Sequence, residues 1–296
     1  MNKEINKTTI VVLSGKGGTG KTTISNILIE KLQSKVFIDC DVDAPNLHLV
    51  QKTNVKPIER GFVGLPKYQI VQNLCIHCSK CYSLCAYQAI NKTNDTYTID
   101  PYRCEGCSLC CVKCPADAIK QVEQIDGHTY IYNQQDKLFG TAQTNIGAGN
   151  SGKLVTEIRN QIRDENVKTE FEIIDGPPGI GCPVIASITN TNFALLVTEP
   201  SLSGLSDLKR IIQTALILKT IPVVIINRAD LNIKLSAVIE KYLKDNGIIY
   251  LGKLPYDKNI IRKNNLEPYD EESIFFKKMN EIIKKLIELI NKEKEI

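Results

Sequence analysis

The feature that most constrains this chain is a glycine-rich loop near its N-terminus, Ser14-Gly15-Lys16-Gly17-Gly18-Thr19-Gly20-Lys21-Thr22-Thr23. An apolar run typical of a strand, 9–13, precedes the loop, and a helical pattern, 24–32, follows it. Strand, loop and helix in this order, with a glycine, four residues and then Gly-Lys-Thr, form the pattern of a phosphate-binding loop. The alternative is a glycine-rich turn that binds nothing, and it fits poorly because every position of the pattern is filled.

The pattern also predicts what individual residues of the loop do. Its glycines let successive backbone N–H groups surround an anion, and the helix N-terminus adds partial positive charge. Lys21 is expected to reach the β and γ phosphates of ATP, and the Thr22 hydroxyl is expected to ligate Mg²⁺. The nucleotide-binding residues are then Gly15, Gly17, Gly18, Thr19, Gly20, Lys21, Thr22 and Thr23.

Length and composition exclude several other classes of protein. At 296 residues, the chain has room for about two ordinary domains. Its net charge of +4 implies neither a nucleic-acid partner nor an anionic membrane. The first residues are polar, and no apolar run approaches the roughly 18 residues of a membrane span. We therefore expect a cytoplasmic protein that binds neither nucleic acid nor membrane.

Carboxylates follow two further predicted strands. Asp39, Asp41 and Asp43 come after the short apolar strand 36–38, and Asp175 comes after the apolar strand 171–174 and before Gly-Pro-Pro-Gly. Ligands of α/β sheets bind at the carboxyl ends of the strands. A carboxylate of the first group is therefore expected to orient the attacking water or hold a Mg²⁺-bound water, and Asp175 to bind Mg²⁺ through water. An ordinary polar loop and a plain turn are the alternatives.

Eleven cysteines are the outlier of the composition, and nine of them lie between Cys75 and Cys114. An odd number in a chain without an export signal argues against disulfides, and the clustering favours metal. Two runs follow the spacing C-x2-C-x2-C-x3-C of bacterial ferredoxins, in which the fourth cysteine of each run ligates the other cluster. The spacing therefore predicts two [4Fe–4S] clusters, one on Cys75, Cys78, Cys81 and Cys114 and the other on Cys104, Cys107, Cys110 and Cys85.

Zinc is the competing metal, because two C-x2-C pairs can form a four-cysteine site. Such a site would leave four cysteines without a metal, whereas two cubanes use all eight. The segment after each run also repeats, because residues 87–90 resemble residues 116–119. Such a repeat is typical of the internal duplication of a ferredoxin fold. We therefore favour iron–sulfur clusters. Cys111 lies outside the register and is expected to be a small buried residue.

The alternation of strands and helices resumes after the cysteines. Asn227 and Pro255 follow two of the later predicted strands, at the edge where an open α/β sheet binds nucleotides, so both are expected to contact the base. A helix capped by Ser151 is expected over 152–163. The last apolar-periodic segment, 279–290, is expected to cover the sheet rather than anchor a membrane, because its polar face carries glutamates as well as lysines. Strands are predicted over 137–142, 193–198, 223–226 and 248–251.

The segment from Gly15 to Thr23, with Lys16 as well as Lys21, resembles the deviant Walker A motif of the MinD/ParA/Mrp and nitrogenase iron protein superfamily. Together with the cysteine runs, it resembles members of that superfamily that contain an inserted ferredoxin domain. The resemblance implies an α/β fold with a mostly parallel sheet flanked by helices, and an inserted α+β 2[4Fe–4S] ferredoxin-like domain. The expected parts are an ATPase domain over 1–56 and 135–296, and the insert over 57–134.

The resemblance also implies roles in a dimer. ATP would be sandwiched between two copies of the chain, with Lys16 reaching the phosphates bound by the partner. Asp41, at the position of the switch I aspartate, would activate water, and Asp175 would begin switch II. Asn227 and the Pro255 loop would hold adenine.

Cys182 departs from the pattern of the nitrogenase iron protein. It aligns with the cluster-binding cysteine of that protein's switch II, but glycine replaces the second ligand in the loop 149–152. Two ligands from a dimer do not hold a cubane with four thiolates, so Cys182 is expected to be a packing or interface residue. The paired C-x-x-C site of Mrp-type carriers is also absent outside the insert.

The sequence thus predicts an ATPase that couples nucleotide binding and hydrolysis to electron transfer, through two [4Fe–4S] clusters, to an unidentified redox client. The alternative is an iron–sulfur or metal-cofactor assembly ATPase, against which the complete ferredoxin spacing argues. A positioning ATPase on a membrane or another surface is a third reading, which the glutamates of the last helix oppose.

Overall fold

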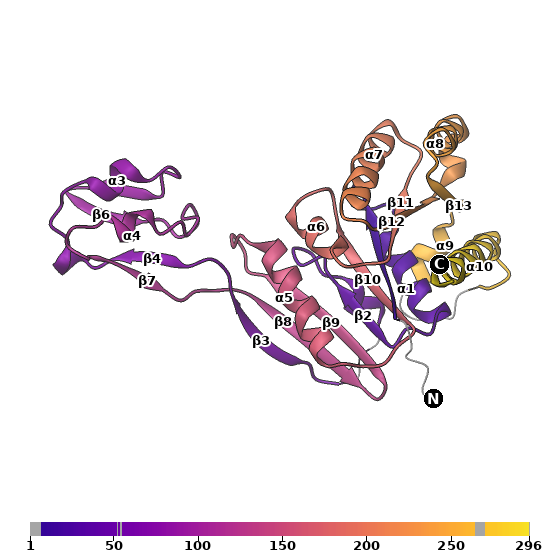
Figure 1. Cartoon of the computed structure of the whole chain (residues 1–296), viewed down its shortest axis with the longest axis horizontal. Helices are drawn as coiled ribbons and strands as arrows, with labels where there is room; N and C mark the ends of the chain where they lie inside the picture. Colours follow the sequence, from indigo (N-terminus) through magenta and orange to yellow (C-terminus); the bar gives the residue numbers. More distant parts are fainter. Residues whose placement is uncertain (1–6, 52, 54, 264–269, 296) are drawn as a thin grey trace.

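The fold is organised around one nine-stranded sheet with the order β13-β12-β11-β1-β10-β2-β9-β8-β3 (Figure 1). The structure is a computed structural model that describes residues 7–51, 53, 55–263 and 270–295. The seven strands from β13 to β9 are parallel to one another. At the other edge, β8 is antiparallel to β9, and β3 is antiparallel to β8. The strands are β1 (Thr8–Ser14), β2 (Val36–Asp39), β3 (Ile58–Val63), β8 (Ile125–Gln134), β9 (Lys137–Thr144), β10 (Phe171–Pro178), β11 (Phe193–Thr198), β12 (Ile221–Ile226) and β13 (Ile249–Lys253).

Helices cover both faces of this sheet, and the strands supply apolar side chains to each. In β1, Val11 and Leu13 join the cluster on one face, whereas Ile10 and Val12 join the cluster on the other, as the two-residue period of a strand requires. The first face is covered by α5 (Ser151–Asp164), α6 (Cys182–Ile188), α7 (Leu202–Ile217) and α8 (Ile233–Asp245). The second is covered by α1 (Lys21–Lys31), α2 (Leu47–Val50), α9 (Lys258–Lys263) and α10 (Ile274–Lys294).

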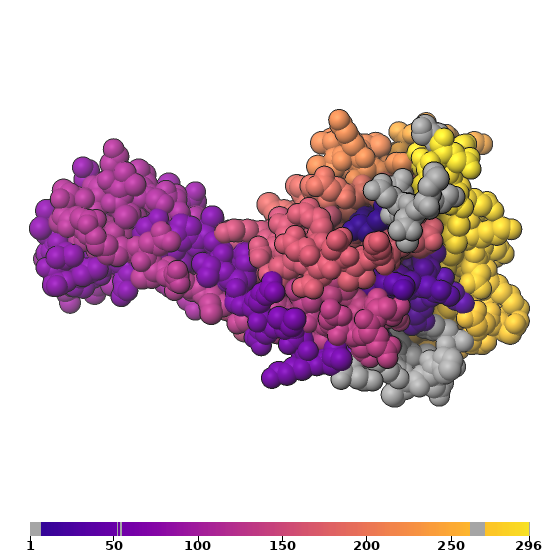
Figure 2. All heavy atoms as spheres, turned by 60° about the horizontal axis from the view of Figure 1, so that its bottom comes forward, coloured from indigo at the N-terminus to yellow at the C-terminus, as the bar shows by residue number. Residues whose placement is uncertain are grey.

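The cysteine-rich segment forms a separate lobe beyond the β3 and β8 edge of the sheet, joined to the larger body by a narrower neck (Figures 1 and 2). Its strands make two antiparallel pairs, β4 with β7 and β5 with β6. We call residues 64–124 the cysteine unit. Its elements are β4 (Lys67–Ile70), η1 (Gln72–Leu74), α3 (Lys80–Leu84), β5 (Ile90–Thr93), β6 (Thr96–Ile99), α4 (Leu109–Val112) and β7 (Ile119–Val122).

The predicted α/β class with a mostly parallel, helix-flanked sheet is confirmed. The boundaries of the insert at 57 and 134 stay predictions. The pairing adds that β3 and β8, the strands at both ends of that segment, extend the large sheet. The last helix packs on the sheet as expected, with Phe276, Met279 and Leu286 in its core cluster. Among the described residues, none of the helices combines the length and the apolar character that crossing a bilayer requires.

Two local expectations were wrong. β10 does not end before Asp175 but continues to Pro178, because its pairing with β1 continues to the register Ser14 with Pro178. Ser151 does not cap the helix after β9. Asn150 takes the N-cap position with a φ of 72°, a left-handed conformation that asparagine tolerates, and Ser151 is the first helical residue.

Truncating Leu286 to alanine is expected to lower the free energy of unfolding by about 2–5 kcal/mol, because a fully buried leucine leaves a cavity behind. Lys284→Ala, at an exposed position of the same helix, is the control and should stay within about 0.5 kcal/mol of the wild type. Urea unfolding measured by circular dichroism gives both values. Equal effects of the two substitutions would contradict the packing of α10 on the sheet.

Candidate functional site

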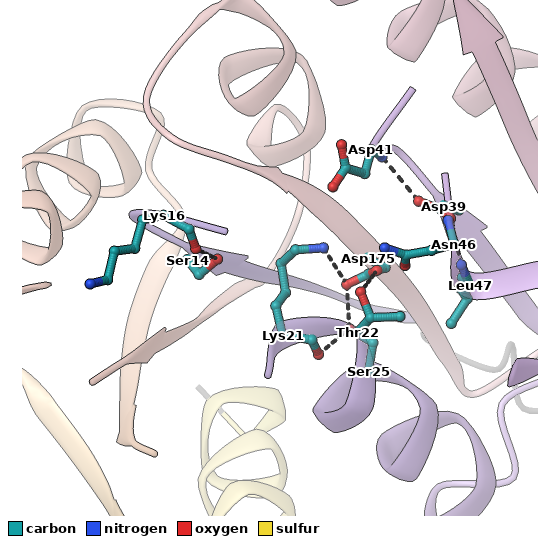
Figure 3. Close-up of polar contacts among 10 residues, drawn as sticks. All are labelled: Ser14, Lys16, Lys21, Thr22, Ser25, Asp39, Asp41, Asn46, Leu47 and Asp175. Carbon is teal, nitrogen blue, oxygen red and sulfur yellow. Dashed lines mark hydrogen bonds and ion pairs between the residues drawn. The ribbon is translucent and has the colours of Figure 1, made fainter. Parts of the chain in front are cut away.

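The centre of the nucleotide-binding region is the buried carboxylate of Asp175 (Figure 3). Lys21 Nζ lies 2.8 Å from Asp175 Oδ1. The Thr22 hydroxyl donates to Oδ2 at 2.8 Å, and the Ser25 hydroxyl donates to Oδ1 at 2.7 Å. Three residues of the loop and helix α1 therefore converge on the strand β10. Burial alone would lower the pKa of Lys21, but the carboxylate of Asp175, followed by Asp39 and Asp41, raises it overall.

The loop leaves room for phosphate and offers the donors that phosphate needs. Apart from the adjoining residues, no heavy atom of the described part of the chain lies within 4 Å of a Cβ placed on Gly17 or Gly18, whereas a Cβ on Gly20 would lie 2.6 Å from the amide of Asn227. The buried hydroxyl of Thr19 has no hydrogen-bond partner among the described residues. The Thr22 hydroxyl and the Asp175 carboxylate are oxygen ligands of the kind that Mg²⁺ prefers. These residues fit a nucleotide with its magnesium ion.

The first group of acids divides into two roles. Asp39 is fully buried and accepts N–H groups from Asp41 at 3.0 Å, Asn46 at 2.9 Å and Leu47 at 2.8 Å, so it fixes the loop after β2 (Figure 3). Burial and then the Asp175 carboxylate raise the pKa of Asp39 to about 7. Asp41 is partly exposed, and burial raises its pKa while Lys21 opposes the shift. Water activation by Asp41 stays a prediction.

Lys16 points away from Lys21 (Figure 3). Its ammonium forms an ion pair with Glu199 of the same chain and lies 3.5 Å from the Ser203 hydroxyl. Its side chain remains partly exposed, at 38%. No local pattern around Lys16 predicts this ion pair, because Glu199 follows a strand far along the chain.

Asn227 and Pro255 meet beside the phosphate-binding loop. With Gly20, Thr23 and Tyr256 among their neighbours, they line a shallow hollow. The Asn227 amide donates to the carbonyl of Thr19 at 2.7 Å, which joins the end of β12 to the loop. Tyr256 directly follows Pro255 and belongs to the loop that the sequence places at the nucleotide crevice. Contact of these residues with adenine stays a prediction.

The eight cysteines of the two runs line two hollows in the cysteine unit. Each hollow takes three cysteines from one run and the fourth from the other, which is the arrangement that the ferredoxin spacing predicts. The first hollow is lined by Cys75, Cys78, Cys81 and Cys114, and the second by Cys85, Cys104, Cys107 and Cys110. Whether they hold clusters stays a prediction.

The two halves of the cysteine unit resemble each other, and equivalent residues lie 29 positions apart, as Cys75 and Cys104 do. The Tyr68 hydroxyl lies 2.6 Å from the Ser108 hydroxyl, and the equivalent pair, Tyr97 and Ser79, lies at 2.5 Å. Each half therefore bonds to the other. The backbone N–H of Ala89 donates to Cys85 Sγ, and that of Ala118 to Cys114 Sγ, both at 3.3 Å. Positive φ angles recur at His77 and Gly106, Ser79 and Ser108, and Gln88 and Asp117.

The side chains do not single out any one metal. Among the described residues, no group of three or more His, Cys, Asp or Glu is spaced to hold a single metal ion. Cys111 is only partly buried, and its thiol lies 3.2 Å from the Ile119 carbonyl rather than in either hollow. Cys182 is exposed at the start of α6, where Gly152 lies against it. Its role at an interface stays a prediction.

The comparisons with known proteins decide the family. The model of the CobQ/CobB/MinD/ParA nucleotide binding domain matches residues 10–267. The chain belongs to this family. It is thus a nucleotide-binding ATPase of the MinD/ParA type, which confirms the coarse prediction of an ATP site. An uncharacterized protein of Methanocaldococcus jannaschii is 35% identical over 210 residues, 69% of this chain and 72% of the relative.

Two further similarities are informative. The septum site-determining protein MinD of Pyrococcus horikoshii, solved with Mg-ADP, superposes with a TM-score of 0.56 at 20% identity, over 96% of this chain and 97% of its own. This likeness shows the fold. The pyruvate synthase subunit PorD of Methanocaldococcus jannaschii is 37% identical over 51 residues, which are 17% of this chain and 59% of that subunit.

Replacing Asp39 by asparagine is expected to change how stability depends on pH. A carboxyl whose pKa is raised on folding binds its proton more tightly in the folded state. Its stabilisation is therefore complete below about pH 4 and is lost as the pH rises to about 7. Between pH 5 and pH 8, without nucleotide, the unfolding free energy of the wild type should fall by roughly 2–3 kcal/mol relative to Asp39→Asn. Urea unfolding at both pH values measures the difference, and parallel pH profiles would contradict the raised pKa.

Proposed function

We propose that this protein is an ATPase whose nucleotide site gates electron transfer, through two [4Fe–4S] clusters in the cysteine unit, to a redox client protein. The observation that carries the proposal is the pair of hollows, each lined by four cysteines from both runs. When bound, the clusters would supply two one-electron carriers. The similarity of 51 residues to a pyruvate synthase subunit adds support for an iron–sulfur role.

The cysteine sets suit cubanes better than single ions. A cubane spreads its four thiolates over separate corners, whereas the ligands of one zinc ion must converge on a single point. The described cysteines do not converge in that way. The N–H groups of Ala89 and Ala118 already donate to the sulfurs of Cys85 and Cys114, the fourth ligand of each set. Such N–H bonds help to set the potential of a cluster.

A short series of contacts connects the nucleotide site to the cysteine unit. After Asp41, the Asp43 carboxylate accepts the Thr144 hydroxyl at 2.9 Å, and the Thr144 N–H donates to the Val42 carbonyl at 2.9 Å. Thr144 ends β9 and leads into a loop in which Gly147 meets the ring of Tyr102. A Cβ on Gly147 would lie 2.8 Å from that ring. A shift of the loop after β2 would therefore be transmitted to the cysteine unit.

The same proposal includes a homodimer with ATP at its interface. Lys16 would leave Glu199 and reach the phosphates bound by the partner. The exchange is accessible because both partners of the ion pair are partly exposed, and ion pairs that water reaches contribute little stability. Asp41 would orient the attacking water, and Asp175 would hold a water of the Mg²⁺ shell. Asn227 and Pro255 would enclose the adenine.

Double substitutions test the cluster assignment. In the anaerobically isolated protein, Cys75→Ala/Cys114→Ala should remove one cluster and lower the iron content from about eight to about four atoms per chain. Cys75→Ala/Cys85→Ala should remove both clusters, because it takes one ligand from each set. Iron and sulfide analysis measures the outcome, and Cys111→Ala, which should keep both clusters, is the control. Equal iron loss in the two double variants would contradict the crossed assignment.

Substituting Tyr102 by alanine tests the gate. In the wild type, Mg-ATP is expected to shift the reduction potential of at least one cluster. Tyr102→Ala should lose most of that shift while it keeps its iron content and ATP hydrolysis, because the contact with Gly147 is removed. Tyr82→Ala, at an exposed tyrosine of the same unit, is the control and should keep the shift.

Redox titrations with and without Mg-ATP measure both variants. A wild-type protein whose potentials ignore Mg-ATP would contradict the gate itself. If Tyr102→Ala keeps the full shift in reduction potential on addition of Mg-ATP, the signal does not pass through the contact of Tyr102 with Gly147. ATP-dependent delivery of clusters to an apo-protein, without a shift in potential, would support the assembly ATPase instead.

A further inference from the structure

Lys67 brings a buried positive charge to only one of the two hollows. It begins β4, is 8% exposed, and its ammonium donates to the carbonyls of Cys104 at 2.8 Å and Pro101 at 2.9 Å. Cys104 lines the second hollow. Neither of these partners is a carboxylate, so the two bonds satisfy two of the three ammonium N–H donors without cancelling the charge.

The internal repeat offers a direct comparison for this residue. The position 29 residues after Lys67 is Thr96, an uncharged and exposed residue at the start of β6. The next residues, Tyr68 and Tyr97, make the same hydroxyl contact with Ser108 and Ser79. The two halves therefore match in backbone and in polar bonds but differ in this charge.

Other charged side chains at the hollows are exposed. Lys80 lines the first hollow and Glu105 the second, and both are open to solvent. Water screens exposed charges strongly, whereas a buried charge acts through a lower effective dielectric and is less sensitive to salt. Lys67 is therefore expected to outweigh Glu105 at the second hollow, and Lys80 is expected to affect the first hollow only weakly.

We propose that Lys67 makes the cluster on Cys85, Cys104, Cys107 and Cys110 the more easily reduced of the two. The inference rests on the proposed function, because it requires both clusters. A cluster that accepts one electron from a low-potential one-electron donor gains one negative charge, which a nearby ammonium stabilises. Removing that ammonium should therefore lower the reduction potential of that cluster and leave the other unchanged.

The cluster proposed to be more easily reduced is also the one nearer the ATPase body. The loop that carries Cys104 lies on the side of the ATPase body, since Tyr102, two residues before Cys104, lies beside Gly147, where a Cβ would be 2.8 Å from its ring. An electron that enters the unit would come to rest in the second hollow, next to the contact proposed to respond to ATP. Lys67 thus places the electron where the nucleotide can influence it.

The test is a redox titration of the full-length, anaerobically isolated protein with dithionite, followed by electron paramagnetic resonance. The wild type should show two separate potentials. Lys67→Met should lower the equilibrium constant for reducing the more easily reduced cluster by about tenfold or more, which is about 59 mV per tenfold for one electron. Lys67→Arg should keep the wild-type values. Lys80→Met, which removes an exposed charge, should change either constant by less than about threefold.

Several outcomes would overturn the inference. One is that the two clusters of the wild type have equal reduction potentials. Another is that the difference, or gap, between the two potentials remains in Lys67→Met. If Lys67→Met does not fold, the wild-type gap is measured at about 0.1 M and about 1 M salt, where the screening length falls from about 10 Å to about 3 Å. A persistent gap supports the buried charge, and a collapsed gap refutes it. Iron analysis separates the two proposals: no clusters refutes both, whereas two clusters without a gap refutes only the role of Lys67.

Discussion

The structure depends on one buried carboxylate, that of Asp175. An isolated charge in the interior is strongly unfavourable, so it must find partners, and here it finds Lys21, Thr22 and Ser25. These three belong to the loop and helix after β1, whereas Asp175 belongs to β10. The pairing of the two strands and the charge network therefore fix the same relative position. Any ligand that takes Lys21 or Thr22 must act on β10 as well.

This constraint extends from the site into both neighbouring segments. Beyond Asp175, the N–H of Gly179 donates to the Ser14 carbonyl at 3.0 Å, so the segment after β10 stays tied to the start of the loop. On the other side, the carboxyl of Asp39 organises the loop after β2. The Asp175 charge also acts on this loop, since it contributes to the raised pKa of Asp39. One charge thus links three strand ends that would surround a nucleotide.

Sequence reasoning found what local pattern determines. The loop from Ser14 to Thr23 and the buried strands β11 and β12 carry their own signals, as glycine spacing and unbroken apolar runs. β3 carries almost none, because five of its six residues are exposed and only Phe62 is buried. Its place in the large sheet comes from pairing with β8. The ion pair of Lys16 and the burial of Lys67 likewise depend on residues distant in sequence, so no local pattern could predict them.

The cysteine unit combines symmetry in its frame with asymmetry in its charge. Each half contributes a tyrosine bonded to the other half and a fourth cysteine to the other hollow, so neither half is complete alone. Such a frame would by itself give two equivalent sites, between which an electron has no preference. Only a residue that differs between the two halves, or a contact made by one half alone, can distinguish them. Lys67 is a buried feature of that kind, and the contact of Tyr102 with Gly147 breaks the symmetry on the same side, toward the nucleotide-binding body.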